Sequence, residues 1–139
     1  MVEQHCDVYR RQFALEAFRD PIGGHIVAVT GPHTAGVIVP RLLAAAACHL
    51  LDMAPVPVFA VGGDLRVFLT EGVPDSSATL RLSWSLFRYP IVPTLTPTPL
   101  ALPTPGSGLR SWLWPPEGPA RPPIATVVAA LQAATRLGS

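Results

Sequence analysis

The residue types that most often carry chemistry are scattered along this chain, and few of them form a recognisable motif. Gly31 and Gly36 have the two-glycine spacing of a phosphate-binding loop. Such a loop needs Lys and then Ser or Thr directly after the second Gly, to reach the phosphates and the magnesium ion. Val37 and Ile38 occupy those positions, so we interpret the segment as an ordinary turn and expect no nucleotide there.

Two adjacent His/Cys pairs raise the hypothesis of a zinc site: His5-Cys6 and Cys48-His49. Zinc accepts Cys and His in tetrahedral sets, and structural sites usually draw closely spaced pairs of ligands from one turn. Adjacent residues of a helix point about 100° apart, so neither pair chelates easily. We expect buried cysteines beside bystander histidines, with no metal and no other cofactor.

Histidines and carboxylates are the residues that could act as general acids, general bases or metal ligands in catalysis. His25 and His33 flank the first predicted strand, and the carboxylates Asp64, Glu71 and Asp75 lie around a predicted hairpin. Carboxylates that bind metal for phosphoryl transfer share a strand face when they are two residues apart, and the chain has no D-x-D or D-x-E. It also lacks the G-x-S-x-G elbow. We expect no catalytic residues, and a small enzyme using His33 or Asp64 stays an alternative.

Arginine and aromatic residues suggest an interaction surface. These residue types bind single-stranded nucleic acid by phosphate pairing and base stacking, and here they are Arg66, Arg81, Arg88, Arg110, Trp84, Tyr89, Trp112 and Trp114. Trp112 and Trp114 alternate along a predicted strand, so we expect both on one face, as a core wall or as a stacking surface. The candidate binding residues are Arg66, Arg88, Arg110 and Trp112. Because the net charge is only +1, nucleic-acid binding should be weak and salt-sensitive.

The composition indicates one folded domain, residues 1–139. The chain is 49% apolar and only 14% charged, the opposite of the balance that produces disorder. Two cysteines are too few for a disulfide framework, and the N-terminus lacks the apolar stretch of a secretory signal. The longest apolar run, residues 35–51, falls short of the roughly 20 residues that span a bilayer. We expect a cytoplasmic protein that does not enter a membrane.

Hydrophobic periodicity predicts the elements that position these residues. Apolar residues at helical spacing predict an amphipathic helix within residues 1–20. An α/β core follows at 25–89, and it begins with strands at 25–30 and 36–39 joined by a turn and a helix at 40–51. A hairpin of two strands, 56–61 and 65–70, is predicted around Gly62-Gly63. The core ends with an alternating strand within 80–92. After Pro122-Pro123 a last helix is predicted, over residues 122–137.

Residues 90–121 are rich in proline but interleaved with large apolar residues such as Leu95, Leu100 and Trp112. Solvated linkers seldom carry so many apolar groups, so we expect ordered short strands and extended segments. A polyproline linker, or a ligand for a proline-recognition domain, is the alternative. The predicted fold is α+β: a single small domain, mostly an antiparallel sheet of short strands, with an N-terminal, a central and a C-terminal helix.

Three segments carry a resemblance to a known family: the hairpin at 56–69 around its glycine turn, the stretch LPTPGSGLRSWLWPP at 102–116, and the predicted helix at 124–136. With the strands from Ile26 onward, they resemble actinobacterial proteins that are similar to the N-terminal domain of bifunctional DNA primase/polymerases. The family pattern is a strand pair, a helix, a hairpin with a glycine-rich turn, and a proline-rich strand pair before a last helix.

Active members of that family carry a D-x-D before the first core helix, a His after the glycine turn, and a later acidic residue. The matching places read Val37-Ile38-Val39, Asp64-Leu65-Arg66 and Leu86-Phe87-Arg88. The resemblance therefore implies a polymerase-like scaffold without its catalytic set. We expect a non-catalytic accessory or regulatory protein with a protein partner. The alternatives are a weak single-stranded nucleic-acid-binding module and a small enzyme, and a homodimer is also considered.

Overall fold

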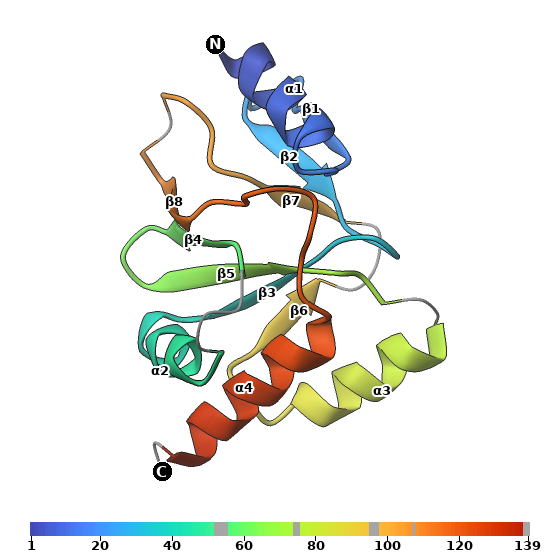
Figure 1. Ribbon diagram of the computed structural model, residues 1–139, viewed down its shortest axis with the longest axis vertical. Coiled ribbons are helices and arrows are strands. Elements are labelled where there is room, and N and C mark those ends of the chain that lie inside the picture. The colour runs from blue at the N-terminus through green and yellow to red at the C-terminus, as the bar shows by residue number, and fades with distance from the viewer. Residues whose placement is uncertain (52–55, 74–75, 95–97, 107, 138–139) are drawn as a thin grey trace.

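The computed structural model describes residues 1–51, 56–73, 76–94, 98–106 and 108–137. Figure 1 shows the helices and strands that these residues form. In chain order they are α1 (Val2–Arg11), β1 (Ala17–Arg19), β2 (Ile26–Val29), β3 (Ala35–Pro40), α2 (Arg41–Leu51), β4 (Val58–Val61), β5 (Leu65–Thr70), α3 (Ser76–Leu86), β6 (Val92–Thr94), β7 (Pro99–Ala101), β8 (Arg110–Trp114) and α4 (Ile124–Leu137).

The strands pair into two antiparallel sheets. The smaller sheet has the order β1-β2-β7 and the larger one the order β6-β3-β5-β4-β8. With α1 at the start, α2 in the middle and α4 at the end of the chain, this arrangement confirms the predicted α+β fold of mostly antiparallel short strands. The helix α3 is an addition that the sequence did not predict.

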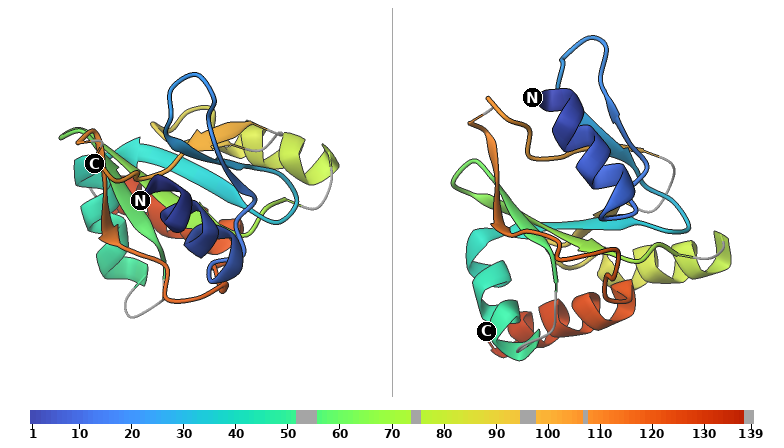
Figure 2. Two further views of the ribbon diagram at one scale, coloured as in Figure 1. Left: turned by 90° about the horizontal axis from the view of Figure 1, so that it is seen from above. Right: turned by 45° about the horizontal axis from the view of Figure 1, so that its top comes forward.

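The larger sheet lies in the middle of the molecule and buries an apolar cluster on each face. Alternate residues of a strand point to opposite faces, so Val58 and Phe68 pack toward α2 and α4, whereas Phe59 and Val67 pack toward α1 and the smaller sheet. Figure 2 shows these layers, with α2, α3 and α4 on one side of the larger sheet and α1 on the other. Both core clusters therefore depend on this one sheet.

The hairpin of β4 and β5 is confirmed, and its turn explains why it forms there. Gly62 has a φ of 61°, a left-handed conformation that glycine adopts without the steric cost of a Cβ atom. The predicted helices at 40–51 and 122–137 are confirmed as α2 and α4. Ordered strands in the proline-rich part are confirmed as β6, β7 and β8, while Leu95 lies outside the described residues.

The predicted strand within residues 80–92 is wrong, because residues 76–86 form the helix α3 and β6 begins only at Val92. The apolar residues that seem to alternate as in a strand also recur at helical spacing. Leu82 and Leu86, four residues apart, pack against the core together with Ala78, which is the spacing that places side chains on one helix face. Trp84 and Leu86 consequently do not share a face.

Two further predictions about the N-terminal third need correction. The predicted helix within residues 1–20 ends at Arg11, and residues 17–19 form β1 instead. The strands β2 and β3 follow one another but do not pair: β2 bonds to β1 and β7, and β3 bonds to β5 and β6. The chain passes from one sheet to the other at residues 30–34, so the turn predicted there is a connection between layers.

Candidate interaction sites

The residues considered for catalysis do not converge. His33 and Asp64 are exposed, on the β2–β3 connection and in the β4–β5 turn, and Asp75 lies outside the described residues. Cys6 packs in the cluster on one face of the larger sheet and Cys48 against the cluster on the other. In the part of the chain that the structure describes, no three His, Cys, Asp or Glu side chains come close enough to hold a metal ion.

The four candidate binding residues do not form one surface. Arg66 is on β5 and Arg110 begins β8, with β4 between the two strands. Arg88 follows α3, where its guanidinium carbon lies 5.4 Å from the centre of the Phe87 ring. Trp112 is half-buried, and its ring meets Phe59 edge-on with 5.4 Å between centroids. The described contacts of Trp112 are therefore internal.

Trp112 and Trp114 lie on opposite faces of the larger sheet, contrary to the prediction of one shared face. Phe59 of β4 pairs with Trp112, but its neighbour Val58 pairs with Trp114, so the register shifts by one residue. This β-bulge lets Leu113 and Trp114 turn to the same side. Trp114 thereby faces α2, while Trp112 packs on the α1 side.

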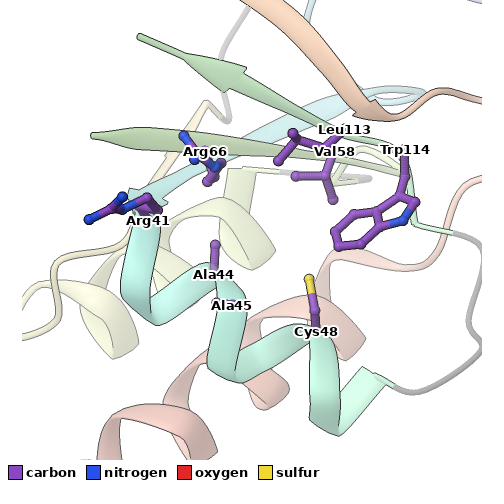
Figure 3. Close-up of a pocket in the computed structure, with 8 residues that line it drawn as sticks. All are labelled: Arg41, Ala44, Ala45, Cys48, Val58, Arg66, Leu113 and Trp114. Carbon is purple, nitrogen blue, oxygen red and sulfur yellow. The ribbon is translucent and has the colours of Figure 1, made fainter. Parts of the chain in front are cut away.

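The space between α2 and β8 is an open, mostly apolar groove, which we call the α2–β8 groove (Figure 3). Its volume is about 220 Å³. The apolar lining consists of Ala44, Ala45, Cys48, Val58, Leu113 and Trp114. Desolvation raises the pKa of the Cys48 thiol, so the thiol stays protonated at neutral pH and is a weak nucleophile. The groove is suited to binding and not to covalent chemistry on Cys48.

Two arginines, Arg41 and Arg66, provide the positive charge of this groove. Figure 3 shows both at one end of it, with Trp114 and Cys48 at the other end. The Nη1 atom of Arg66 donates a 2.8 Å hydrogen bond to the carbonyl of Leu65. Among the described residues, neither guanidinium forms an ion pair with a carboxylate. The apolar groove is therefore bordered at one end by two arginines, and no carboxylate in the described part of the chain forms an ion pair with either of them.

A second surface lies on the outer side of α3 and the turn after it. We call it the α3 face: Leu80, Arg81, Trp84, Phe87 and Arg88. The side chains of Trp84 and Phe87 are 67% and 66% exposed, and their rings meet edge-on with 5.8 Å between centroids. Leu80 is 60% exposed. Exposed apolar groups that gather in one patch commonly mark an interaction site.

The α3 face is basic as well as aromatic. The segment Ser76–Leu86 contains no Asp or Glu, and Arg81 and Arg88 are both exposed. The helix is attached through its other side, where Ala78, Leu82 and Leu86 pack against the core, and Nε2 of Gln132 on α4 bonds to its Ser85 carbonyl at 3.4 Å. The helix thus has one apolar stripe that packs and a second one that contacts solvent.

Sequence reasoning named Arg81, Trp84 and Arg88 by residue type and chose Arg88 as a binding residue, but it missed Leu80 and Phe87. A signal was present, because Leu80, Trp84 and Phe87 recur at the i, i+4, i+7 spacing of a helix. The groove could not be found in this way, since its lining comes from residues as distant as Arg41 and Trp114.

Of the described helices, none has the length and apolar character needed to cross a membrane. No family model matches the chain, and neither a curated protein nor a solved structure matches it.

Proposed function

We propose that this protein is a non-catalytic accessory or regulatory module that binds a partner protein through the α3 face. The observation that supports this best is the exposed pair of Trp84 and Phe87 beside Arg88. Tryptophan and arginine are enriched among the residues that dominate binding energy at protein interfaces. The contacts among these three side chains hold them together before a partner arrives, which lowers the entropy lost on binding.

The partner should present apolar and acidic groups together. The apolar groups would cover Trp84 and Phe87, and the acidic groups would pair with Arg81 on α3 and Arg88 just after it, since α3 itself contains no carboxylate. A second copy of this chain fits less well, because a symmetric contact between two such faces would bring arginines near arginines. A homodimer through the α3 face is therefore not part of the proposal.

Single-stranded nucleic acid is the second candidate ligand for the same surface. Bases would stack on Trp84 and Phe87, and phosphates would pair with Arg81 and Arg88. Two arginines and a net charge of +1 provide few phosphate contacts, so affinity would be low and would fall steeply with salt. The partner protein is favoured because three large apolar side chains of the α3 face, Leu80, Trp84 and Phe87, are exposed, and a nucleic acid would leave the aliphatic Leu80 without a matching group.

The proposal also includes a primase/polymerase-like scaffold without catalytic activity. The absence of catalytic activity is supported by Val37 and Val39, which stand at the positions that match the family's D-x-D and are fully buried in the core on β3. A carboxylate in either place would be desolvated without a partner. A cytoplasmic location is proposed as well, because Cys6 and Cys48 are both free thiols, as is usual in a reducing compartment.

Photo-crosslinking in the cells that produce the protein tests this proposal. A photoreactive benzoylphenylalanine replaces Leu80 on the α3 face, and in a control it replaces Leu42 of α2, which is 75% exposed. We expect a covalent adduct with one protein only from position 80, and its loss when Trp84→Ala and Phe87→Ala are added.

Equal adducts from both positions, or adducts that persist in the double variant, would contradict binding through the α3 face. Fluorescence anisotropy with a labelled oligothymidine tests the second candidate in parallel. Binding that depends on Trp84 and disappears at moderate salt, without any protein adduct, would replace the partner protein by nucleic acid.

A further inference from the structure

We propose that the α2–β8 groove binds a compact organic anion whose body is an aromatic ring or a branched apolar chain. The groove has a different character at each end, with arginines at one and a tryptophan at the other. Neither end includes a residue of the α3 face. This second binding site is therefore independent of the partner surface proposed above.

The apolar end sets the size of the ligand body. A cavity of roughly 150 Å³ lined by aliphatic and aromatic side chains accommodates benzene, and this groove measures about 220 Å³. One ring or one branched chain with a short arm therefore fits. Ala44 and Ala45 leave room beside α2, since their side chains are small, and Trp114 supplies a flat wall at the end where Cys48 lies.

The indole of Trp114 is available to a ligand because it is 53% exposed in the structure. It faces the groove only because of the β-bulge at Val58 and Phe59, which turns Trp114 to the same side as Leu113. An exposed indole beside a groove loses unfavourable contact with water when an apolar body covers it. Binding would therefore bury an apolar surface that the protein leaves open by itself.

The arginine end sets the charge of the ligand. Arg41 and Arg66 come from different elements, α2 and β5, and both line the same groove. Guanidinium groups form bidentate hydrogen bonds with carboxylates and with phosphates. Since no described carboxylate pairs with them, an anion at this end would not have to displace an ion-pair partner, although it would compete with the Leu65 carbonyl for Nη1 of Arg66.

The anionic group of the ligand is a carboxylate or a phosphate, and three probes of similar shape test the preference for an anion. They are phenylacetate, phenyl phosphate and the neutral phenylacetamide. Two-dimensional NMR of the intact chain records which amide signals shift. We expect the anionic probes to shift the signals of Ala44, Ala45 and the Trp114 indole, with affinity about tenfold above that of phenylacetamide, the effect of one charge-assisted contact. The tighter of the two anions identifies the preferred group.

Variants assign the charge preference to the arginines. Arg41→Gln and Arg66→Gln should each weaken binding of the anionic probes about five- to tenfold and leave phenylacetamide unchanged. Arg11→Gln on α1, an exposed arginine outside the groove, is the matched control and should change nothing. Trp84→Ala should also leave these titrations unchanged, which separates this site from the α3 face.

Equal affinity for phenylacetate and phenylacetamide would overturn the proposal, and so would a charge preference that survives in both glutamine variants. Failure of all three probes to shift groove signals at roughly 10 mM, well above the dissociation constant expected of a good fragment, would also overturn it. The NMR spectrum reports the folded state of each variant directly, so loss of binding through unfolding is distinguished from loss of a contact.

Discussion

The indole Nε1 of Trp112 donates a 3.0 Å hydrogen bond to the phenol oxygen of Tyr9, 103 residues earlier in the chain. Tyr9 in turn donates a 2.6 Å hydrogen bond to the carbonyl of Pro103. This relay joins α1 to β8 and to the proline-rich segment. It gives Trp112, which the sequence suggested for binding, a structural role.

Removing the Tyr9 hydroxyl should destabilise the fold. In Tyr9→Phe, the Trp112 indole loses its acceptor and the Pro103 carbonyl loses its donor, at a cost of about 1–3 kcal/mol for buried groups left unpaired. Urea unfolding followed by circular dichroism measures the free energy of unfolding. Tyr89→Phe is the matched control, since the Tyr89 ring packs against the other core cluster; it should change stability by less than about 0.5 kcal/mol. Equal stability of Tyr9→Phe and wild type would refute the role of the relay.

Arg121 should stabilise the junction between the two layers. Its guanidinium donates hydrogen bonds to the carbonyl of Phe13 at 2.6 Å, to that of His33 at 3.3 Å and to Oγ1 of Thr34 at 3.0 Å. Burial lowers the pKa of Arg121 and the charge of Glu71 partly offsets this, so a charged group is held in a desolvated place by these acceptors. Arg121→Met should cost about 2–3 kcal/mol.

The control for Arg121 is Arg11→Met, at an exposed position on α1, where the loss should stay below about 0.5 kcal/mol. Thermal unfolding of both variants compares them under the same conditions. Similar melting temperatures for the two variants would show that the Arg121 contacts add no net stability.

Gly72 should tolerate no side chain. A Cβ atom there would lie 1.8 Å from the carbonyl oxygen of Gly31 and 2.5 Å from the carbonyl carbon of Pro32. Both are backbone atoms, so Gly72→Ala forces the chain to move and should cost about 3 kcal/mol. Gly63→Ala is the control, because nothing lies within 4 Å of its Cβ position, and it should be neutral. Equal melting temperatures for the two alanine variants would contradict the close approach.

The free energy of unfolding should decrease at alkaline pH. Desolvation raises the pKa of the Cys6 and Cys48 thiols above their ordinary 9.0 and that of the Tyr9 phenol above 10.0. The unfolded chain releases these protons at the ordinary values while the folded chain still holds them. The folded state therefore binds more protons above about pH 9, and the free energy of unfolding decreases as pH rises through the folded-state pKa values.

Urea unfolding at several values between about pH 8 and pH 10.5 measures this slope. Cys48→Ala removes one of the three groups and should make the decline shallower. A free energy of unfolding that stays constant or increases over this range would contradict burial of the three protonated groups.

Much of the fold could be predicted because its signals are local. The β4–β5 hairpin is marked by Gly62 in a left-handed turn, and α2 and α4 by runs of helix-forming residues after proline. Residues 80–86 were misassigned to a strand because apolar residues occur there at both two- and four-residue intervals. The segment is a helix because Leu82 and Leu86 then pack together against the core. That packing involves residues distant in the sequence, so the local pattern cannot show it.

The candidate sites were harder to predict than the fold. The side of the sheet that Trp114 faces depends on how β8 pairs with Val58 and Phe59, which is a property of two strands and not of one. Arg66 was selected for its residue type, but Arg41, which shares its groove, was not. On the α3 face, Arg88 was selected while Phe87, the ring beneath it, was overlooked because the segment was taken for a strand.

Binding through the α3 face is tested most directly by calorimetry with the protein that crosslinks at position 80. The purified partner is titrated with wild type, with Trp84→Ala and with Leu42→Ala, an exposed leucine of α2. We predict that Trp84→Ala weakens the affinity at least about tenfold, as expected for a central interface tryptophan, and that Leu42→Ala matches wild type. Equal affinities for wild type and Trp84→Ala would contradict the proposed interaction surface.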